Sequence, residues 1–176
     1  ASMGGELFVM DDGWFGDKYP RKNDSSSLGD WVVDKNKLPN GIEGLLSDAK
    51  KHGVKFGIWI EPEMANTTSE LYEKHPDWVL KASERDVVLG RGGTQVVLDL
   101  ANPAVQDFVF GVVDNLMTSY PEIDYIKWDA NMSVQNHGSQ YLTKDNQSHM
   151  YIEFHRGFEK ICQRIRAKYP DLTIQA

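Results

Sequence analysis

The apolar positions of the chain fall into short runs that alternate with longer amphipathic segments. Short runs rich in β-branched and aromatic residues are typical of buried strands. They cover residues 7–10, 56–60 and 123–128, with an extended segment at 95–100 and a last run at 172–176. Helical spacing marks residues 39–53, 69–75, a segment from Pro103 to near Tyr120, and one carrying Met150 to Ile165. This alternation predicts an α/β fold with a parallel sheet and right-handed crossovers.

Each of the first four extended runs leads into carboxylates. The acids that follow them are, in chain order, Asp11 and Asp12, Glu61 and Glu63, Asp99, and Asp129. A strand end that needed only a turn would use Gly, Asn or Ser as readily as an acid. Barrels of alternating strands and helices keep their catalytic groups at the carboxyl ends of the strands. The pattern therefore predicts the rim of an active site.

The number of strands is too small for a closed barrel. Eight βα units need about 250 residues, whereas the sequence has 176 residues. We therefore expect a partial (β/α)8 TIM barrel, about half of the barrel, with residues 1–176 forming an incomplete catalytic domain. Residues 1–3 resemble a cloning remnant.

Composition excludes several other classes of protein. The 26 acidic and 19 basic residues give a net charge of −7, which argues against a nucleic-acid-binding face. No apolar run approaches the ~18–20 residues of a membrane span. The single cysteine, Cys162, excludes an internal disulfide and a cysteine-built metal site, and its place in the helical pattern predicts a core position. We expect a cytoplasmic protein.

Tryptophan residues cluster near the predicted strand ends. Four of the five, Trp14, Trp31, Trp59 and Trp128, lie at or just beyond them. Any one of these rings is more simply explained by core packing. Together with carboxylates they favour a carbohydrate site, because a sugar has apolar C–H faces and an equator of hydroxyls.

A metal-dependent or Schiff-base enzyme is the alternative on the same residues. In an enolase-type barrel the acids would hold Mg²⁺, and in an aldolase-type barrel Lys127 would act as a base or form a Schiff base. Lys127 is equally explained as the charge partner of Asp129 or Asp11.

Five blocks of the sequence resemble glycoside hydrolase family 36, the retaining α-galactosidases grouped with the raffinose and stachyose synthases. The blocks are Asp11-Asp12-Gly13-Trp14-Phe15, Gly29-Asp30-Trp31, Gly57-Ile58-Trp59-Ile60-Glu61-Pro62-Glu63-Met64, Val97-Leu98-Asp99-Leu100 and Lys127-Trp128-Asp129-Ala130-Asn131. Their order and spacing are similar to the bacterial branch of the family. The resemblance implies hydrolysis of terminal α-galactosides of the melibiose and raffinose type, with no metal and no cofactor.

The resemblance also implies the chemistry at the central block. Asp129 would be the nucleophile that forms a covalent galactosyl intermediate. Lys127 would bond sugar hydroxyls and keep Asp129 ionised through its positive charge. Asn131 would bond the 2-hydroxyl, a contact that strengthens in the transition state.

Four further residues would bind the sugar by the same resemblance. Asp11 and Asp12 would accept hydrogen bonds from the 4- and 6-hydroxyls, which distinguishes galactose from glucose. Trp31 would close over the sugar from its loop. Arg91 would also reach the sugar, although Gly92-Gly93-Thr94 separates it from Gln95, which it directly precedes in the family pattern.

The family's general acid is an aspartate on a later strand, beyond the run that begins near Thr173. The chain alone is therefore expected to be inactive and, because a cut barrel exposes strand edges, to form homo-oligomers. A non-catalytic galactoside-binding module and a raffinose-type galactosyltransferase fragment are the alternatives.

Overall fold

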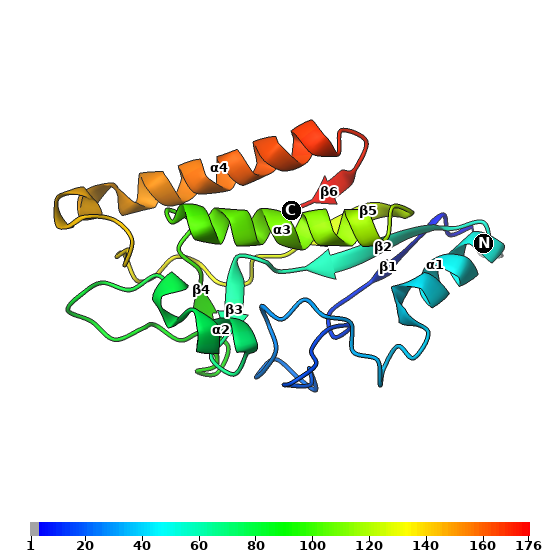
Figure 1. Ribbon diagram of the computed structural model, residues 1–176, viewed down its shortest axis with the longest axis horizontal. Helices are drawn as coiled ribbons and strands as arrows, with labels where there is room; N and C mark the ends of the chain where they lie inside the picture. The colour runs from blue at the N-terminus through cyan, green and yellow to red at the C-terminus, as the bar shows by residue number, and fades with distance from the viewer. Residues whose placement is uncertain (1–3) are drawn as a thin grey trace.

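The computed structural model describes residues 4–176, so the expected cloning remnant lies outside the described residues. The helices and strands are, in order, β1 (Leu7–Met10), α1 (Gly41–Lys51), β2 (Lys55–Ile60), β3 (Met64–Asn66), α2 (Glu70–Lys74), β4 (Gln95–Val97), α3 (Pro103–Ser119), β5 (Ile123–Trp128), α4 (Met150–Lys168) and β6 (Thr173–Gln175), with short 3-10 helices at Pro76–Trp78 and Lys144–His149. Four strands form one parallel sheet in the order β1-β2-β5-β6 (Figure 1). The predicted α/β class with a parallel sheet is confirmed.

The two faces of this sheet differ in chemistry, because successive residues of a strand point to opposite faces. One face is apolar and fully buried at Ile58 and Ile126. Helix α4 covers this face, and Trp128 meets its Phe158 edge-on, with ring centroids 5.9 Å apart. Helix α3 packs along α4 (Figure 1). The opposite face carries Lys127 and is free to present polar groups.

Helix α3 shows how the sequence sets these elements. The side chain of Asn102 accepts a hydrogen bond from the backbone N–H of Ala104 at 2.9 Å and caps the first turn. Val105, Val109 and Val113 follow at every fourth position and are fully buried. Within the described residues, no helix is long and apolar enough to cross a membrane.

The segment at 95–100 is not a barrel strand. Its first residues form β4, which pairs antiparallel with β3 in a separate two-stranded sheet. Asp99 is buried, accepts hydrogen bonds from the N–H of Ala101 and the hydroxyl of Ser139, and has its pKa raised by burial. The expectation that Asp99 belongs to the active-site rim is therefore wrong. A short apolar run followed by an acid has the same pattern in an antiparallel strand as in a parallel one.

The long loop after β1 is ordered by close backbone packing. An antiparallel bridge joins Phe15 to Val33. Gly16 has a φ of 107°, and a Cβ on it would lie 2.5 Å from Ser27 Oγ and 2.8 Å from the carbonyl of Tyr19. Only glycine fits this approach, and it brings the loop back against the strand ends.

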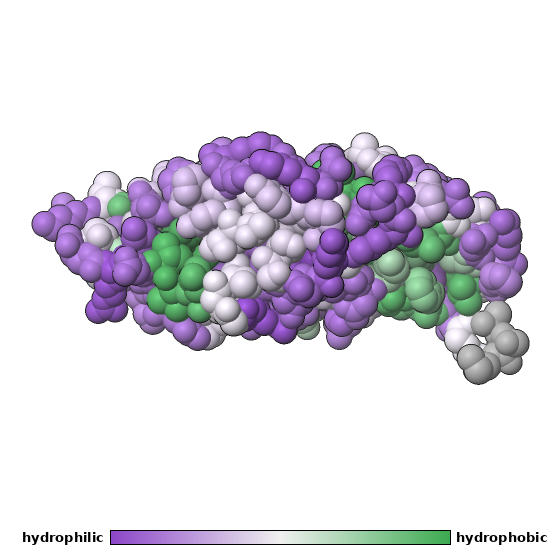
Figure 2. Space-filling view, turned by 90° about the horizontal axis from the view of Figure 1, so that it is seen from below, coloured by the Kyte–Doolittle hydropathy of each residue, from purple (hydrophilic) through white to green (hydrophobic). Residues whose placement is uncertain are grey.

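The outer positions of the sheet and of α4 remain accessible. Strands β1 and β6 each have one strand neighbour within residues 4–176. Leu7 and Phe8 of β1 are exposed, and a hydrophobic area lies beside the N-terminal end in Figure 2. Cys162 of α4 is also exposed, so its predicted core position is wrong. It follows the buried Ile161 by one residue, which on a helix is a turn of about 100°.

Candidate active site

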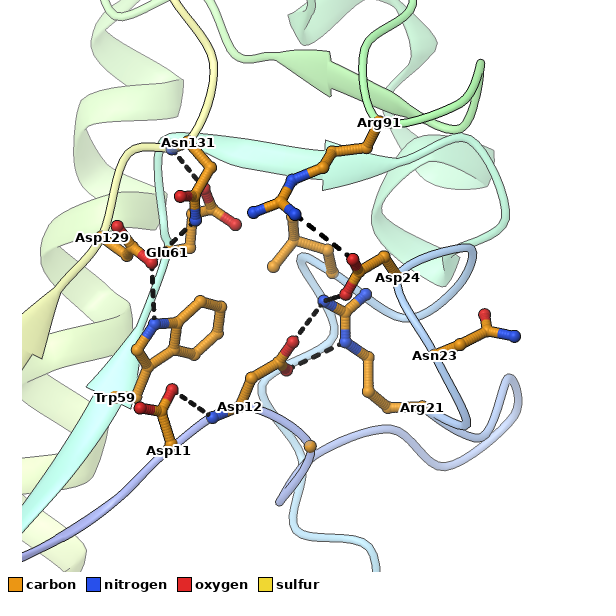
Figure 3. A network of polar contacts seen from close by, with 12 residues as sticks. Asp11, Asp12, Arg21, Asn23, Asp24, Trp59, Glu61, Arg91, Asp129 and Asn131 are labelled. Atoms are coloured by element: carbon orange, nitrogen blue, oxygen red, sulfur yellow. Dashed lines mark hydrogen bonds and ion pairs between the residues drawn. The ribbon is translucent and has the colours of Figure 1, made fainter.

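The carboxyl ends of β1, β2 and β5 meet at one edge of the sheet. Trp59 of β2 lies opposite Lys127 of β5 in the parallel register. The residues that leave these strands, Asp11, Glu61 and Asp129, therefore gather around one space (Figure 3). The predicted rim acids Asp11, Glu61 and Asp129 are brought together here, whereas Glu63 accepts a hydrogen bond from Trp128 on the helix-covered face.

Asp129 is held by three donors. Its Oδ2 accepts hydrogen bonds from Trp59 Nε1 at 3.1 Å and from Asn131 Nδ2 at 2.7 Å, and its Oδ1 accepts one from the N–H of Ala130 at 3.1 Å. Its own N–H donates to the carbonyl of Ile60 at 2.8 Å, which extends the strand pairing by one residue. The carboxylate is therefore fixed by the sheet.

Lys127 and Asp11 form an ion pair on the polar face, with Nζ 3.0 Å from Oδ2. The hydrogen bond to Asp11 is the main reason that the pKa of Lys127 is raised. The pKa of Asp11 is lowered, first by the backbone N–H of Asp12 and then by Lys127. A lysine with a raised pKa keeps its proton, whereas a Schiff-base lysine must lose it. The pairing therefore favours a charge partner and argues against the aldolase-type alternative.

Glu61 also lies in the site. The sequence analysis placed it in the strand-end pattern but gave it no role. Its side chain is 1% exposed, and its Oε1 accepts a hydrogen bond from the backbone N–H of Asn131 at 2.6 Å. Burial raises the pKa of Glu61, and the charge of Asp129 adds to the effect. Glu61 thus supports the turn that places Asn131 beside Asp129.

Arg91 reaches the same space from the loop that precedes β4. It lies in a turn with a φ of 48°, next to Gly92 and Gly93, which also have positive φ. Its Nη1 lies 3.4 Å from Asp24 Oδ2, and Figure 3 shows its side chain directed between Asp24 and Glu61. The three-residue separation from Gln95 is accommodated by this turn.

Asp12 is paired with Arg21, which sequence reasoning missed. Two parallel hydrogen bonds, Nε to Oδ1 at 2.9 Å and Nη2 to Oδ2 at 2.7 Å, join the side chains. A single arginine in a polar loop has no periodicity or spacing that would single it out.

The tryptophans divide between the site and the core. Trp31 packs in an aromatic cluster with Phe15, Trp14 and Trp59, at ring-centroid distances of 4.6, 5.9 and 6.1 Å. Trp14, Trp59 and Trp128 are buried, so of the four rings expected near a sugar site only Trp31 is partly exposed. Trp128 follows Lys127 and therefore points to the helix-covered face.

Metal ligation was the other alternative suggested by the acids. Across residues 4–176, no three His, Cys, Asp or Glu side chains come together in a group that could hold an ion. The acids of the site are instead bound to Lys127, Arg21 and backbone or side-chain N–H groups.

Comparison with known sequences gives one family. The melibiase family profile matches residues 1–176. The α-galactosidase AgaA of Geobacillus stearothermophilus is 39% identical over 176 residues, covering 100% of this chain and 23% of that protein. A probable α-galactosidase C of Aspergillus flavus is 41% identical over 179 residues, covering 98% of this chain and 22% of that protein.

Solved structures agree. The α-galactosidase of Lactobacillus brevis superposes with a TM-score of 0.91 at 40% identity, covering 99% of this chain and 23% of that one. A variant of AgaA in complex with raffinose gives a TM-score of 0.91 at 38% identity, covering 98% and 23%. The chain thus spans less than a quarter of these relatives. Because the match extends over its whole length, the chain belongs to the melibiase family, glycoside hydrolase family 36.

Proposed function

We propose that this chain is the nucleophile-bearing part of a retaining α-galactosidase that hydrolyses terminal α-galactosides of the melibiose and raffinose type. The observation that carries the proposal is the Asp129 carboxylate, fixed at a strand end by Trp59, Asn131 and Ala130. The relatives support the choice of substrate. Variants of AgaA are described in complexes with 1-deoxygalactonojirimycin, raffinose and stachyose.

Asp129 would act through its less engaged oxygen. Oδ2 accepts from two side chains, whereas Oδ1 accepts from a single N–H and keeps a lone pair for attack. This oxygen forms a bond to the anomeric carbon as the glycosidic C–O bond breaks, and the leaving oxygen takes a proton from a general acid. Water then attacks the anomeric carbon from the face that the leaving group occupied, gives its proton to the former general acid and releases Asp129, so that two inversions retain the configuration. We place the general acid outside residues 1–176.

The polar groups around Asp129 would bind the galactosyl hydroxyls. Asp11 and Asp12 accept from the 4- and 6-hydroxyls, and Lys127 donates to the sugar. The Nδ2 of Asn131 is already bound to Asp129, which leaves its amide oxygen for the 2-hydroxyl.

Trp31 and Arg91 would close the site from two loops. Trp31 offers a ring braced by the aromatic cluster, which suits an apolar C–H face of the sugar. Arg91, directed into the space between Asp24 and Glu61, donates a hydrogen bond to a hydroxyl of the substrate.

The wider architecture follows from the same proposal. The four parallel strands are about half of a TIM barrel, and residues 1–176 are an incomplete catalytic domain. The chain alone is inactive, associates with itself, binds neither nucleic acid nor membranes, and derives from a cytoplasmic enzyme that uses no cofactor. The exposed apolar side chains of β1 support the need for a neighbour at that edge.

A 2-fluorogalactosyl inactivator tests the assignment in the full-length protein. We expect the label on Asp129, identified by sequencing the modified peptide, with matching loss of melibiose hydrolysis. Asp107→Asn, at an exposed acid on α3, serves as the control and should be labelled like the parent. Label on another residue would show that Asp129 is not the nucleophile. Binding of galactosides without any label or turnover would favour the non-catalytic module, and transfer to sucrose in preference to water would favour the galactosyltransferase.

A further inference from the structure

A buried arginine lies behind the acids of the site. The side chain of Arg21 is 3% exposed, and all three guanidinium nitrogens are hydrogen bonded. Nε and Nη2 bind the two oxygens of Asp12, and Nη1 donates to the carbonyl of Ser26 at 2.9 Å and to Asn66 Oδ1 at 3.0 Å. Such planar, two-point pairing fixes the orientation as well as the position of a carboxylate.

Asp12 needs such an anchor because it lies beyond the last paired residue of β1. Its side chain is 31% exposed, so the carboxylate is not fully enclosed by its partners. A carboxylate has about four lone-pair positions, and the fork of Arg21 uses one on each oxygen. Asp12 can therefore be held by Arg21 and still accept hydrogen bonds from substrate hydroxyls.

The arginine is itself anchored to β3 through Asn66. Asn66 Oδ1 accepts from both Arg21 and the N–H of Leu28, the latter at 2.9 Å. Asn66 Nδ2 donates to the carbonyls of Asp24 at 2.8 Å and Thr94 at 3.1 Å. The position of Arg21 is thus set by a strand outside its own loop.

Asp24 extends this network to the other side of the site. One of its oxygens lies 3.4 Å from Arg21 Nη2, and the other lies 3.4 Å from Arg91 Nη1 (Figure 3). Two residues with proposed sugar contacts, Asp12 and Arg91, are therefore joined through one buried guanidinium, that of Arg21, and one carboxylate, that of Asp24.

The network buries a charged side chain, that of Arg21. Burying an ion pair usually adds little stability compared with well-packed apolar residues of similar volume. The fork geometry, by contrast, is something that an apolar residue or a lysine cannot supply.

We propose that Arg21 is a positioning and specificity-determining residue, which orients Asp12 toward galactosyl hydroxyls and couples it to Arg91 through Asp24. The proposal rests on the proposed function. Arg21 acts through Asp12 and does not touch the substrate.

A double-mutant cycle in the full-length protein tests it. Arg21→Lys keeps the charge and removes the fork, and we expect kcat/KM for an α-galactoside to fall roughly tenfold or more. The preference for an α-galactoside over the matching α-glucoside should fall with it. In an Asp12→Asn background the same substitution should cost less than about threefold, because the partner it orients is already altered.

Two further measurements keep the test decisive. Lys18 lies in the same loop as Arg21 and forms an exposed ion pair with Glu73 of α2. Lys18→Gln is therefore the matched control, and it should leave kcat/KM for both sugars unchanged. Asp24→Asn, at an exposed carboxylate, should weaken galactoside binding roughly twofold to fivefold even where Arg21→Lys fails to fold. Calorimetry with 1-deoxygalactonojirimycin and 1-deoxynojirimycin measures the ratio of the two binding affinities, and therefore the specificity, without turnover.

The outcomes separate the two proposals. Equal losses from Arg21→Lys in the parent and Asp12→Asn backgrounds, or unchanged sugar preference, overturn the role of Arg21 while the α-galactosidase assignment stands. Where Arg21→Lys fails to fold, unchanged calorimetric preference in Asp24→Asn overturns it. A parent that neither hydrolyses α-galactosides nor binds 1-deoxygalactonojirimycin overturns the proposed function itself.

Discussion

The indole N–H of Trp59 donates a hydrogen bond to Oδ2 of Asp129 across 3.1 Å. Trp59 lies in β2, and Asp129 directly follows the adjacent parallel strand β5. Trp59 is fixed in turn, because its carbonyl accepts a hydrogen bond from Trp14 Nε1 at 2.9 Å and its ring stacks at 6.1 Å on Phe15. A buried aromatic cluster therefore sets the position of the carboxylate.

Trp59→Phe should separate this hydrogen bond from the packing of the ring. Loss of a hydrogen bond to a charged group costs about 1.5–3 kcal/mol, so we expect kcat of the full-length protein to fall roughly tenfold or more. KM should change less, because the substitution leaves the sugar contacts in place. Steady-state kinetics with melibiose measure both quantities.

Trp128→Phe is the matched control. It also removes an indole N–H from a carboxylate, Glu63 Oε1 at 2.8 Å, but on the helix-covered face. We expect a lower Tm with kcat nearly unchanged. Equal losses of kcat in the two variants would show that the Trp59 effect is general destabilisation.

Asp11→Asn and Asp12→Asn test the origin of sugar preference. Each removes a charged acceptor from a site that bonds hydroxyls, so kcat/KM for α-galactosides should fall by about 10²-fold or more. The preference over α-glucosides should fall as well. Asp17→Asn, at an exposed acid in the loop after β1, is the control. Variants that discriminate the two sugars as well as the parent would remove the 4- and 6-hydroxyl assignment.

Strand positions were the part of the site that the sequence could predict. The run Ile123–Trp128 is confirmed at both ends, and its acid, Asp129, leaves the strand at the expected edge. Asp99 follows a similar run, and yet that run pairs antiparallel with β3 in a separate two-stranded sheet. The difference depends on which strand each run pairs with. A local pattern of apolar residues does not determine pairing between strands that are far apart in the sequence.

Side-chain partners were the part that could not be predicted. Arg21 pairs with Asp12, nine residues away, and with Asn66, 45 residues away, so its role appears only when two segments meet. The side of the sheet on which Trp128 lies could not be predicted for a simpler reason. Alternation along β5 assigns adjacent residues to opposite faces, and the sequence alone did not say which face was covered.

Glu61→Gln should alter the pH dependence of stability. Burial raises the pKa of Glu61 above its ordinary 4.5. The folded protein then binds this proton more tightly than the unfolded chain, so the free energy of unfolding falls as pH rises from about 4.5 toward the raised value. Gln keeps an oxygen for the N–H of Asn131 and carries no charge. We expect a higher Tm than the parent near pH 7 and little difference below pH 4.5.

Glu73→Gln gives the opposite sign and serves as the control. The pKa of Glu73 is lowered, first by its hydrogen bond to Lys18. Its charge therefore adds stability at pH values above the ordinary 4.5, and that contribution is lost as pH falls through the lowered pKa. Thermal melts of both variants against pH check the pair. A Glu61→Gln gain that persists below pH 4.5 would point to packing rather than charge.

The 176-residue chain on its own should associate and should not hydrolyse melibiose. Phe8 of β1 is 49% exposed beside Leu7, at a sheet edge with one strand neighbour within the described residues. Exposed apolar surface costs about 25 cal/mol per Å², and a strand edge offers N–H and C=O groups to a second chain. Light scattering with an activity assay measures both expectations.

Phe8→Lys should shift the isolated chain toward monomer, because a charge on an edge strand opposes pairing. Val32→Ser is the matched control, since Val32 is 55% exposed in a loop away from that edge, and it should leave the association unchanged. Equal effects of the two substitutions would indicate nonspecific aggregation. A monomer that turns over melibiose would place the general acid within residues 1–176, and the proposed division of the catalytic groups would then be wrong.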